Sequence, residues 1–343
     1  MLTNSDNVPV TVGIVSTSTL GDLNSLKLVT KSSDVTQFGT GNLTDALNIL
    51  LKYNIHAVAV RVATGVDAPA TAANIVGATD DEGLRLLKTV KSTLGRDVVA
   101  VIVPKVQNDS VVTQMVDTAT ELKSLAVAEW LGTYADLITA RGTATNYGLK
   151  SKNLAIVFGQ PFNQPVAESA SAHLAAMIGQ QQKYYNFGLA PIKRKLRDIS
   201  SVTPALTSLQ KSDLMLQGVV IIDTMLVDQF VFNGTRNSLY PSDTLSQDAF
   251  LMRMLVEQII STGVQSYLDS KLGLKMSNTY AYTLEAELSA FLSQYVEMKA
   301  VSKAYAKYNQ AGSDFDAGTL LYDVCVTLIS YTGIASFTFQ VVA

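Results

Sequence analysis

The sequence is short of charged residues. Among its 343 residues, 26 are Lys or Arg and 29 are Asp or Glu, which gives a charged fraction of 16% and a net charge of −3. Soluble domains usually carry about 25% charged residues. Hydrophobic residues make up an ordinary 48%, so a folded chain is expected. The surface should therefore be rich in neutral polar residues, which suggests that much of it does not face bulk water. A charge near zero also gives no reason to expect direct contact with nucleic acid.

Cysteine and histidine are nearly absent. Cys325 is the one cysteine, which excludes a disulfide within the chain, and His56 and His173 are the only histidines. A structural zinc site needs four ligands of these types at close spacing. His56 enters an apolar strand and His173 lies among small residues at helical spacing, so we expect packing roles for both. We expect no catalytic residues, no bound metal and no cofactor.

Long apolar runs are missing too. The longest run in a strand-like segment, Val98 to Val103, is ended by Pro104, whereas a spanning helix needs about 20 apolar residues. The first seven residues have neither the basic nor the apolar stretch of a secretion signal. We expect no membrane insertion.

Apolar strands alternate with amphipathic helices through about the first 170 residues. In the first predicted strand, Val10, Val12 and Ile14 share one face. Further strands are predicted at residues 57–62, 98–103 and 154–158, with helices at about 43–51, 84–94 and 110–130. This order is typical of right-handed βαβ crossovers, so it predicts an α/β layer with a mostly parallel sheet.

The second half groups its helices before its strands. A short strand at 219–222 with a partner at 229–232 comes first, then long helices at about 248–268 and 283–307, then β-rich runs at 321–329 and 334–342. That grouping predicts α+β. The fold class is therefore α/β plus α+β. We expect a short N-terminal strand segment at 1–20, an α/β domain at 21–235 and a C-terminal domain at 236–343.

An α/β layer also raises the possibility of a nucleotide-binding enzyme. The loops that follow residues 62, 104 and 158 lack the spaced glycines and the Gly-Lys-Ser/Thr that hold phosphates. Gly39 to Asn42 precedes a helix, but no apolar strand leads into it, so a turn with a helix cap is expected there. Asp80-Asp81-Glu82 fits the acidic start of a helix. An α/β enzyme stays an alternative without a motif to support it.

Two groups of basic residues stand out. Lys193 to Arg197 holds four cations in five positions without an interleaved aromatic residue, so a solvated or protein-facing loop is expected. Lys299, Lys303 and Lys307 are spaced by four on the last predicted helix, which places them in one row. That row is either simply solvated or faces an acidic protein partner.

The last run of the chain alternates cleanly, with Ala335, Phe337, Phe339 and Val341 on one face. An apolar strand near a terminus must be covered, or it becomes a template for pairing. It either folds back as a hairpin on residues 322–329 or also pairs with another subunit. Both can hold, because a hairpin leaves one edge open.

Several segments together carry a family resemblance, and they appear in order over nearly the whole chain. They are Val8–Val15 with the following Ser16-Thr17-Ser18, Asp34–Gly39, Leu43–Leu47, Ala57–Val62, Phe187–Pro191, Gly218-Val219, Phe232–Asn237, Ala317–Leu320 and Ile334–Val341. In this order the chain resembles the sheath proteins of contractile phage tails and related contractile injection machines. Phe232 stands where the family commonly has a tryptophan.

The resemblance implies a structural protein rather than an enzyme. Its copies would form stacked six-fold rings around a tail tube and contract to drive the tube through the host envelope. The implied partners are other copies of the chain, the tube protein, the baseplate and the tail terminator. The implied location is the virion tail, after assembly in the host cytoplasm. A sheath-like terminator or ring subunit is the alternative within the same machinery.

The resemblance also implies roles for particular residues. Subunits of the family are linked by exchanged strands, for which the candidates here are Ile334, Phe337, Phe339, Val341, Val10 and Val12. A helix of the C-terminal part touches the tube, which makes Lys299, Lys303 and Lys307 the tube-facing candidates. Family members usually have arms before the first strand and after the last one. Because both are short here, we expect either that subunits are linked by fewer contacts or that strand 334–342 is itself donated.

Overall fold

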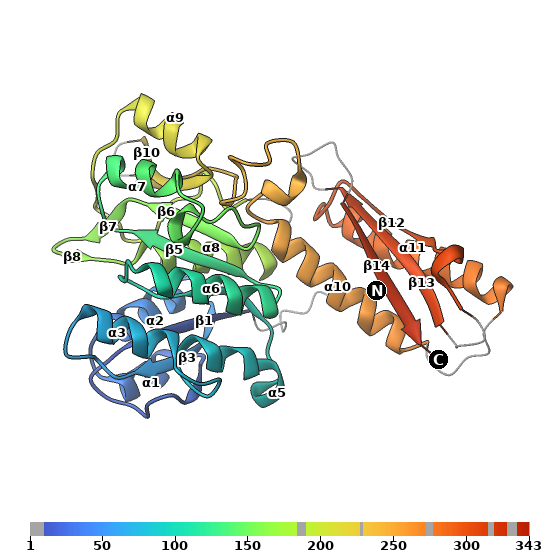
Figure 1. The fold of residues 1–343 in the computed structure, drawn as a ribbon, viewed down its shortest axis with the longest axis horizontal. Coiled ribbons are helices and arrows are strands. Elements are labelled where there is room, and N and C mark those ends of the chain that lie inside the picture. Colours follow the sequence, from blue (N-terminus) through green and yellow to red (C-terminus); the bar gives the residue numbers. More distant parts are fainter. Residues whose placement is uncertain are drawn as a thin grey trace. The chain divides into compact units, whose positions relative to one another are not determined.

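The computed structural model describes residues 10–183, 190–226, 229–271, 277–314, 319–327 and 335–342, the last range without its side chains. These residues form two compact units, divided between Met254 and Leu255. The boundary therefore differs from the expected one near residue 235. The expected separate segment at 1–20 also differs, because its strand belongs to the main sheet of the larger unit (Figure 1).

The larger unit is built on an eight-stranded sheet with the order β11-β10-β6-β5-β4-β1-β3-β2. Its strands are β1 (Thr11–Thr17), β2 (Leu26–Val29), β3 (His56–Val62), β4 (Val98–Ile102), β5 (Leu125–Trp130), β6 (Leu154–Phe158), β10 (Val219–Leu226) and β11 (Gln229–Asn233). Six of them run parallel, and the antiparallel β2 and β11 lie at the two ends of the order. The predicted mostly parallel α/β layer is confirmed.

Strand β5 was not predicted. The expected helix over 110–130 ends instead at Glu121, as α6 (Asp109–Glu121), and the chain turns through Lys123 at φ 51°. All six residues of β5 are buried. A continuously apolar run fits a buried helix and a buried strand equally well, so periodicity alone could not separate the two.

Helices cover both faces of this sheet. One face carries α3 (Ala68–Val76), α4 (Gly83–Leu86), α5 (Val90–Leu94), α6, α7 (Tyr134–Arg141) and α9 (Ser208–Leu216), whose buried side chains share one core with the strands. The other face carries α2 (Asn42–Lys52) and α8 (Ala170–Lys183), which contact each other and β1. A short helix, α1 (Ser32–Val35), precedes α2, and a small antiparallel sheet joins β7 (Gln160–Asn163), β8 (Val166–Ala167) and β9 (Ser201–Thr203).

The smaller unit is a three-stranded antiparallel sheet with helices. Its sheet has the order β12 (Lys303–Tyr308), β13 (Thr319–Thr327), β14 (Ala335–Val342), and its helices are α10 (Arg253–Asp269), which begins just before the division, and α11 (Asn278–Glu297). Leu284, Leu288 and Leu292 of α11 are fully buried. The hydroxyl of Tyr322 on β13 donates to the carbonyl of Ala281, which ties sheet and helix together. The predicted α+β organisation of this part is confirmed.

A buried arginine connects distant parts of the larger unit. Arg141, at the end of α7, is 1% exposed. Its guanidinium makes five hydrogen bonds of 2.7–3.1 Å to backbone carbonyls, namely those of Tyr147, Leu149, Gln217 (twice) and Ser238. A guanidinium has five donors, so all of them are used. Burial lowers the pKa of Arg141 to about 10, and the group therefore stays protonated at neutral pH.

The segment that this arginine holds is itself buried. Asn237 and Ser238 are fully buried, and the Asn237 amide donates to the carbonyls of Lys152, Asp248 and Phe250. The Ser238 hydroxyl lies 2.8 Å from the carbonyl of Leu149. These bonds explain why residues 236–254 belong to the α/β unit and not to the C-terminal one.

Replacing the guanidinium should destabilise the larger unit strongly. In Arg141→Met all five hydrogen bonds are lost and four buried carbonyls are left without this donor. We therefore expect the free energy of unfolding to fall by about 3 to 5 kcal/mol. Arg141→Lys should recover only part of it, because an ammonium cannot reach the same set of carbonyls. Urea unfolding measures both, with Arg194→Met as a control for losing an arginine at a partly exposed site. Equal unfolding midpoints for Arg141→Met and Arg194→Met would contradict this role.

Candidate functional site

The terminal strand lies at the edge of the smaller sheet. In the register of β13 and β14, Phe337 is opposite Val324, Phe339 opposite Tyr322 and Val341 opposite Leu320. These three β13 residues are fully buried. Ile334 lies outside the described residues. Within the described chain β14 pairs with β13 alone, so the hairpin was correctly predicted and the other edge of β14 is open to a further strand.

The two N-terminal candidates for strand exchange occupy a different setting. Val12 lies in β1, which is paired with β3 on one side and with β4 on the other, and Val10 directly precedes it. Both side chains are buried, with exposures of 0% and 5%. A strand with both edges filled has no donors or acceptors left for another chain. The expectation for Val10 and Val12 is therefore corrected, and both are core residues.

The three lysines do not form a helical row. Helix α11 ends at Glu297, and Lys299 follows it at φ 56°, a conformation that stops a helix. Lys303 and Lys307 lie on β12 instead, on one face of the strand, and both are exposed. A spacing of four places residues on one face of a helix and also of a strand, which is why the pattern misled. The Lys303 ammonium lies 4.8 Å from the ring centroid of Tyr305, on the same face.

The basic run 193–197 covers the outer edge of β11. The backbone amides of Lys193 and Leu196 donate to the carbonyls of Phe232 and Phe230, at 3.0 and 2.7 Å. Lys193, Lys195 and Arg197 are exposed. Exposed cations beside a sheet edge discourage pairing with other chains, so this segment protects the edge, in line with the expected solvated loop.

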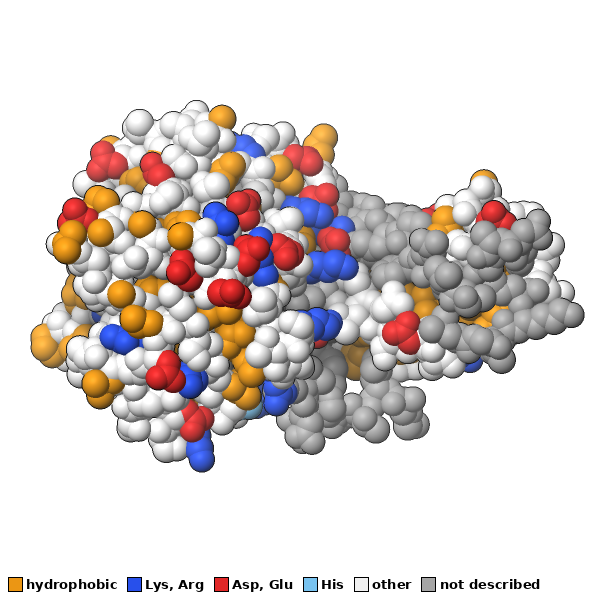
Figure 2. Space-filling model, turned by 60° about the horizontal axis from the view of Figure 1, so that its bottom comes forward, with side chains coloured by type: hydrophobic (Ala, Val, Ile, Leu, Met, Phe, Trp, Pro, Cys, Tyr) orange, Lys and Arg blue, Asp and Glu red, His pale blue; other side chains and the backbone are white. Residues whose placement is uncertain are grey.

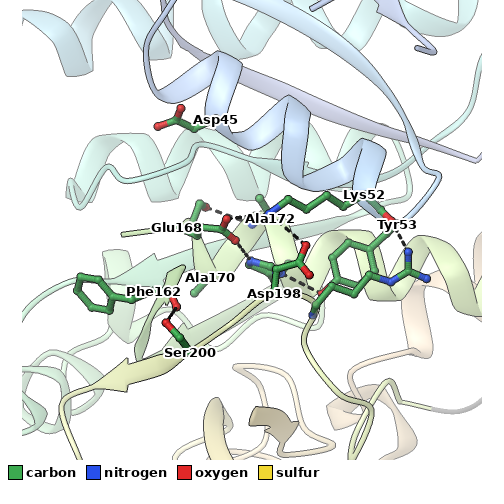
Figure 3. Close-up of polar contacts among 12 residues, drawn as sticks. Asp45, Lys52, Tyr53, Phe162, Glu168, Ala170, Ala172, Asp198 and Ser200 are labelled. Carbon is green, nitrogen blue, oxygen red and sulfur yellow. Dashed lines mark hydrogen bonds and ion pairs between the residues drawn. The ribbon is translucent and has the colours of Figure 1, made fainter. Parts of the chain in front are cut away.

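A buried polar cluster joins α2, α8 and the loop after residue 196 (Figure 3). The Tyr53 hydroxyl lies 3.0 Å from Nδ1 of His173, and Nε2 of His173 lies 2.7 Å from Glu168. Lys52 completes the cluster, 2.9 Å from Glu168 and 3.7 Å from Asp198. The cluster brings together residues as far apart in the chain as Lys52 and Asp198, and its only sign in the sequence is a histidine among small residues.

The partners of the cluster determine where its protons lie. The backbone amide of Arg197 donates to the Tyr53 oxygen at 2.9 Å, which leaves the hydroxyl hydrogen for Nδ1 of His173. The neutral imidazole then carries its hydrogen on Nε2 and donates it to Glu168. Burial lowers the pKa of His173, against the opposing effect of Glu168. Burial would raise the pKa of Glu168, but His173 and Lys52 hold it below its usual value.

The cluster has the residue types of a proton relay, but a substrate cannot reach it. His173 is fully buried, Tyr53 is 2% exposed, and burial raises the pKa of Tyr53 to about 12. A nucleophile needs contact with a substrate and an activating base, whereas this hydroxyl is enclosed and hydrogen-bonded on both sides. The cluster acts as a tie between α2 and α8.

A second buried carboxylate lies at the start of α8. Glu129 of β5 is 2% exposed and accepts from the amides of Ala170 and Ser171, from the Ser169 hydroxyl and from the amide of Lys105. Burial raises the pKa of Glu129, and these four donors oppose that effect. The carboxylate thus caps the helix with a favourable charge. A lone Glu in an apolar strand was the sequence signal for this contact.

The described residues form neither a metal-binding cluster nor a membrane-spanning helix. No three His, Cys, Asp or Glu side chains there gather as a metal site would require. Across the same part of the chain, no helix is long and apolar enough to cross a bilayer.

Comparison with known proteins gives a result for the structure only. No protein-family model matches the chain, and no curated protein sequence matches it. The helical sheath of the anti-feeding prophage in its contracted state matches with a TM-score of 0.72 at 12% identity, over 96% of this chain and 93% of that one. The sheath tail protein of Desulfitobacterium hafniense matches with a TM-score of 0.70 at 11% identity, over 99% and 98%. The chain has the fold of a contractile sheath protein.

A third match supports the same sheath fold. The PVC sheath complex of an extracellular contractile injection system, in its contracted state, matches with a TM-score of 0.72 at 11% identity. The overlap covers 97% of this chain and 92% of that one, so it includes both compact units. The predicted architecture, an α/β part followed by an α+β part that ends in strands, is that of these sheath folds.

The buried cluster predicts a loss of stability in mild acid. The unfolded chain takes up a proton on histidine below about pH 6.5, but folded His173 resists it because its pKa is lowered. The free energy of unfolding should therefore fall as pH drops from about 7 to 5.5, and further below about 4.5 as the Glu168 contacts are lost.

Thermal unfolding against pH, for matched variants, measures this effect. His173→Gln should be less stable at pH 7 but should show a flatter profile between about pH 7 and 5.5. His56→Gln measures the share of the slope that comes from the other histidine, because the pKa of His56 is also lowered, first by burial and then by Arg96 and Lys183, although it lies outside the cluster. An unchanged slope in His173→Gln would show that the cluster does not titrate as described.

Proposed function

We propose that this chain is the sheath subunit of a contractile particle. Its copies would polymerise as stacked six-fold rings around a tail tube, and contraction of the lattice would drive the tube through a host envelope. The observation that carries the proposal is the similarity to sheath structures over 96–99% of the chain, both units included. The proposal places the protein in a tail assembled in the host cytoplasm, with baseplate and terminator proteins at the tail's ends.

The surface of the chain supports a structural role over an enzymatic one. The carboxylates and the histidine that have the chemistry for catalysis, Glu129, Glu168 and His173, are buried and hydrogen-bonded inside the α/β unit. On the face shown in Figure 2, much of the larger unit is neutral or apolar, and charged side chains of both signs are mixed, some in one group and others scattered. A neutral polar surface suits a lattice subunit, because burying charge at many contacts is costly unless each is paired.

The open edge of β14 is the proposed place of strand exchange. Its pairing with β13 brings Phe337, Phe339 and Val341 opposite buried residues, so β14 belongs to the core sheet of its own subunit. The unpaired edge can then accept an extended segment from a neighbouring copy by main-chain hydrogen bonds. In this proposal β14 accepts a strand and does not leave its own sheet.

Microscopy of the purified protein tests the function and the strand exchange together. Negative-stain images should show tubes with six-fold helical order. Successive amides of a strand face opposite edges, so one of Gln340→Pro and Val341→Pro removes a bond to β13 and the other removes only an open-edge donor. The variant that keeps the monomer's unfolding midpoint should form no tubes.

Other images would reject parts of this proposal. Isolated rings without tubes would favour a ring or terminator subunit, and monomers that bind nucleotide tightly would favour the enzyme. Tubes formed by both proline variants would reject strand exchange at β14 while leaving the sheath function intact.

The face of β12 that carries two exposed lysines is the proposed tube contact. It carries Lys303 and Lys307, with Lys299 exposed at the end of α11, and an acidic tube surface would complement them. In Lys303→Glu/Lys307→Glu we expect co-sedimentation with preformed tail tubes to be lost, because the new charges repel that surface. Folding should be unchanged, since both side chains are exposed.

The control for this experiment is Lys193→Glu/Lys195→Glu, which makes the same change of charge on two exposed lysines of the larger unit. It should sediment with tubes as the wild type does. Normal tube binding by Lys303→Glu/Lys307→Glu would remove these lysines from the tube contact.

A further inference from the structure

The parallel sheet sorts helix ends onto two opposite edges of the larger unit. Six strands point the same way, and the helices that connect them run back in the opposite direction. Helix starts therefore gather where the strands end, which we call the carboxyl edge. Helix ends gather where the strands begin, which we call the amino edge.

The carboxyl edge is acidic. Asp67 caps α3 and accepts from the amide of Ala70 at 2.7 Å, Asp109 opens α6, and Asp136 lies in the first turn of α7. All three are exposed. Each lies where the partial positive charge of a helix start favours a carboxylate. The same carboxylates therefore stabilise their helices and make this edge acidic.

The amino edge is basic. Arg96 and Lys123 each stand two residues before a strand, β4 and β5, and Lys183 is in the last turn of α8. That end of α8 is placed by Gly179, where an added Cβ would meet Ile55 and Val10 at 3.1 Å, next to the starts of β3 and β1. Burial lowers the pKa of His56, and the charges of Arg96 and Lys183 lower it further while Asp34 opposes them, so both cations lie near this imidazole.

Ion pairs within each edge leave this difference in place. At the carboxyl edge Asp45 is paired with Lys105 at 3.1 Å, and Arg61 is bound to the carbonyls of Ser18 and Gly21. At the amino edge Lys91 is paired with Asp97 at 2.9 Å and Lys88 with Glu121 at 2.6 Å. Each of these pairs cancels locally, which leaves Asp67, Asp109 and Asp136 at one edge and Arg96, Lys123 and Lys183 at the other.

We infer that the partner of each edge is a second copy of this chain, with the carboxyl edge of one subunit docked on the amino edge of the next. Two different surfaces meet in such a head-to-tail contact, so it continues from copy to copy instead of closing as a dimer. The contact deepens the proposed function, on which the choice of partner rests. Complementary charge makes the subunits stack in one direction only and speeds their association. The neutral surface around the charges can be buried at low cost, because it carries few charges that would need a partner.

Paired charge reversals test the contact with the full chain. Lys123→Glu/Lys183→Glu makes the amino edge acidic, and Asp109→Lys/Asp136→Lys makes the carboxyl edge basic. Each variant alone should lose concentration-dependent self-association in sedimentation velocity, because like charges then meet. An equal mixture should recover it, because each altered edge now complements an altered edge of the other variant. Lys193→Glu/Lys195→Glu, at the side of the sheet, should associate as the wild type does.

Salt gives an independent measurement. Raising ionic strength from roughly 0.01 to 0.1 M shortens the Debye length from about 30 to about 10 Å, so wild-type association should weaken at least about tenfold. Circular dichroism confirms that each variant is folded, which matters for the substituted helix starts. If Asp109→Lys/Asp136→Lys fails to fold, Asp109→Asn/Asp136→Asn takes its place and should weaken association by itself.

The possible outcomes separate this inference from the sheath proposal. Six-fold tubes that form equally well in high salt and in every reversed variant would overturn the inference and leave the sheath function standing. Salt-sensitive association that the mixture restores, without any six-fold order in the images, would support the inference and reject the sheath. A wild-type chain that shows no self-association in low salt would overturn the inference.

Discussion

A single buried guanidinium holds together three segments of the larger unit. Arg141 has no solvent to hydrate it, so its charge is stabilised by five hydrogen bonds to four carbonyl oxygens, from residues up to 97 positions away. Those carbonyls belong to the turn before β10, to the loop after α7 and to the buried segment at Ser238. Removing the guanidinium from water costs several kcal/mol, and the hydrogen bonds offset that cost only while all of these segments stay in place. The segments should therefore unfold together.

That constraint bears on the proposed role. A contractile subunit has to keep its α/β core intact while its contacts with neighbours change. Arg141 on one face of the sheet, and the Tyr53-His173-Glu168-Lys52 cluster between α2 and α8 on the other, tie the connecting segments to the sheet by buried polar bonds. Buried polar groups with every partner supplied rigidify a fold. Contacts between copies are then left to exposed features: a strand edge, a lysine face and two edges of opposite charge.

Strands and helices were predicted correctly where the sequence pattern fitted only one of the two structures. Strands β1, β3, β4, β6, β10 and β11 were predicted close to their observed bounds, because short apolar runs were separated by turn residues. Strand β5 and strand β12 were both assigned to the ends of helices. In the first case the run was apolar except for Glu129, so it fitted a buried helix as well as a buried strand, and in the second the spacing of Lys303 and Lys307 fitted both structures. Candidate residues were then misplaced with the element that carried them.

The sequence by itself determined most of the order of strands and helices and the scarcity of charged residues, cysteine and histidine, because these depend on composition and on local periodicity. Only the tertiary structure decided that Val10 and Val12 are enclosed, that β14 has an open edge and that His173 meets Tyr53 and Glu168. It also decided that acids placed at separate helix starts share one edge. Such contacts join residues far apart in the chain, and no local pattern encodes them. They exist because a parallel sheet brings the ends of its strands, and of the helices between them, to the same side.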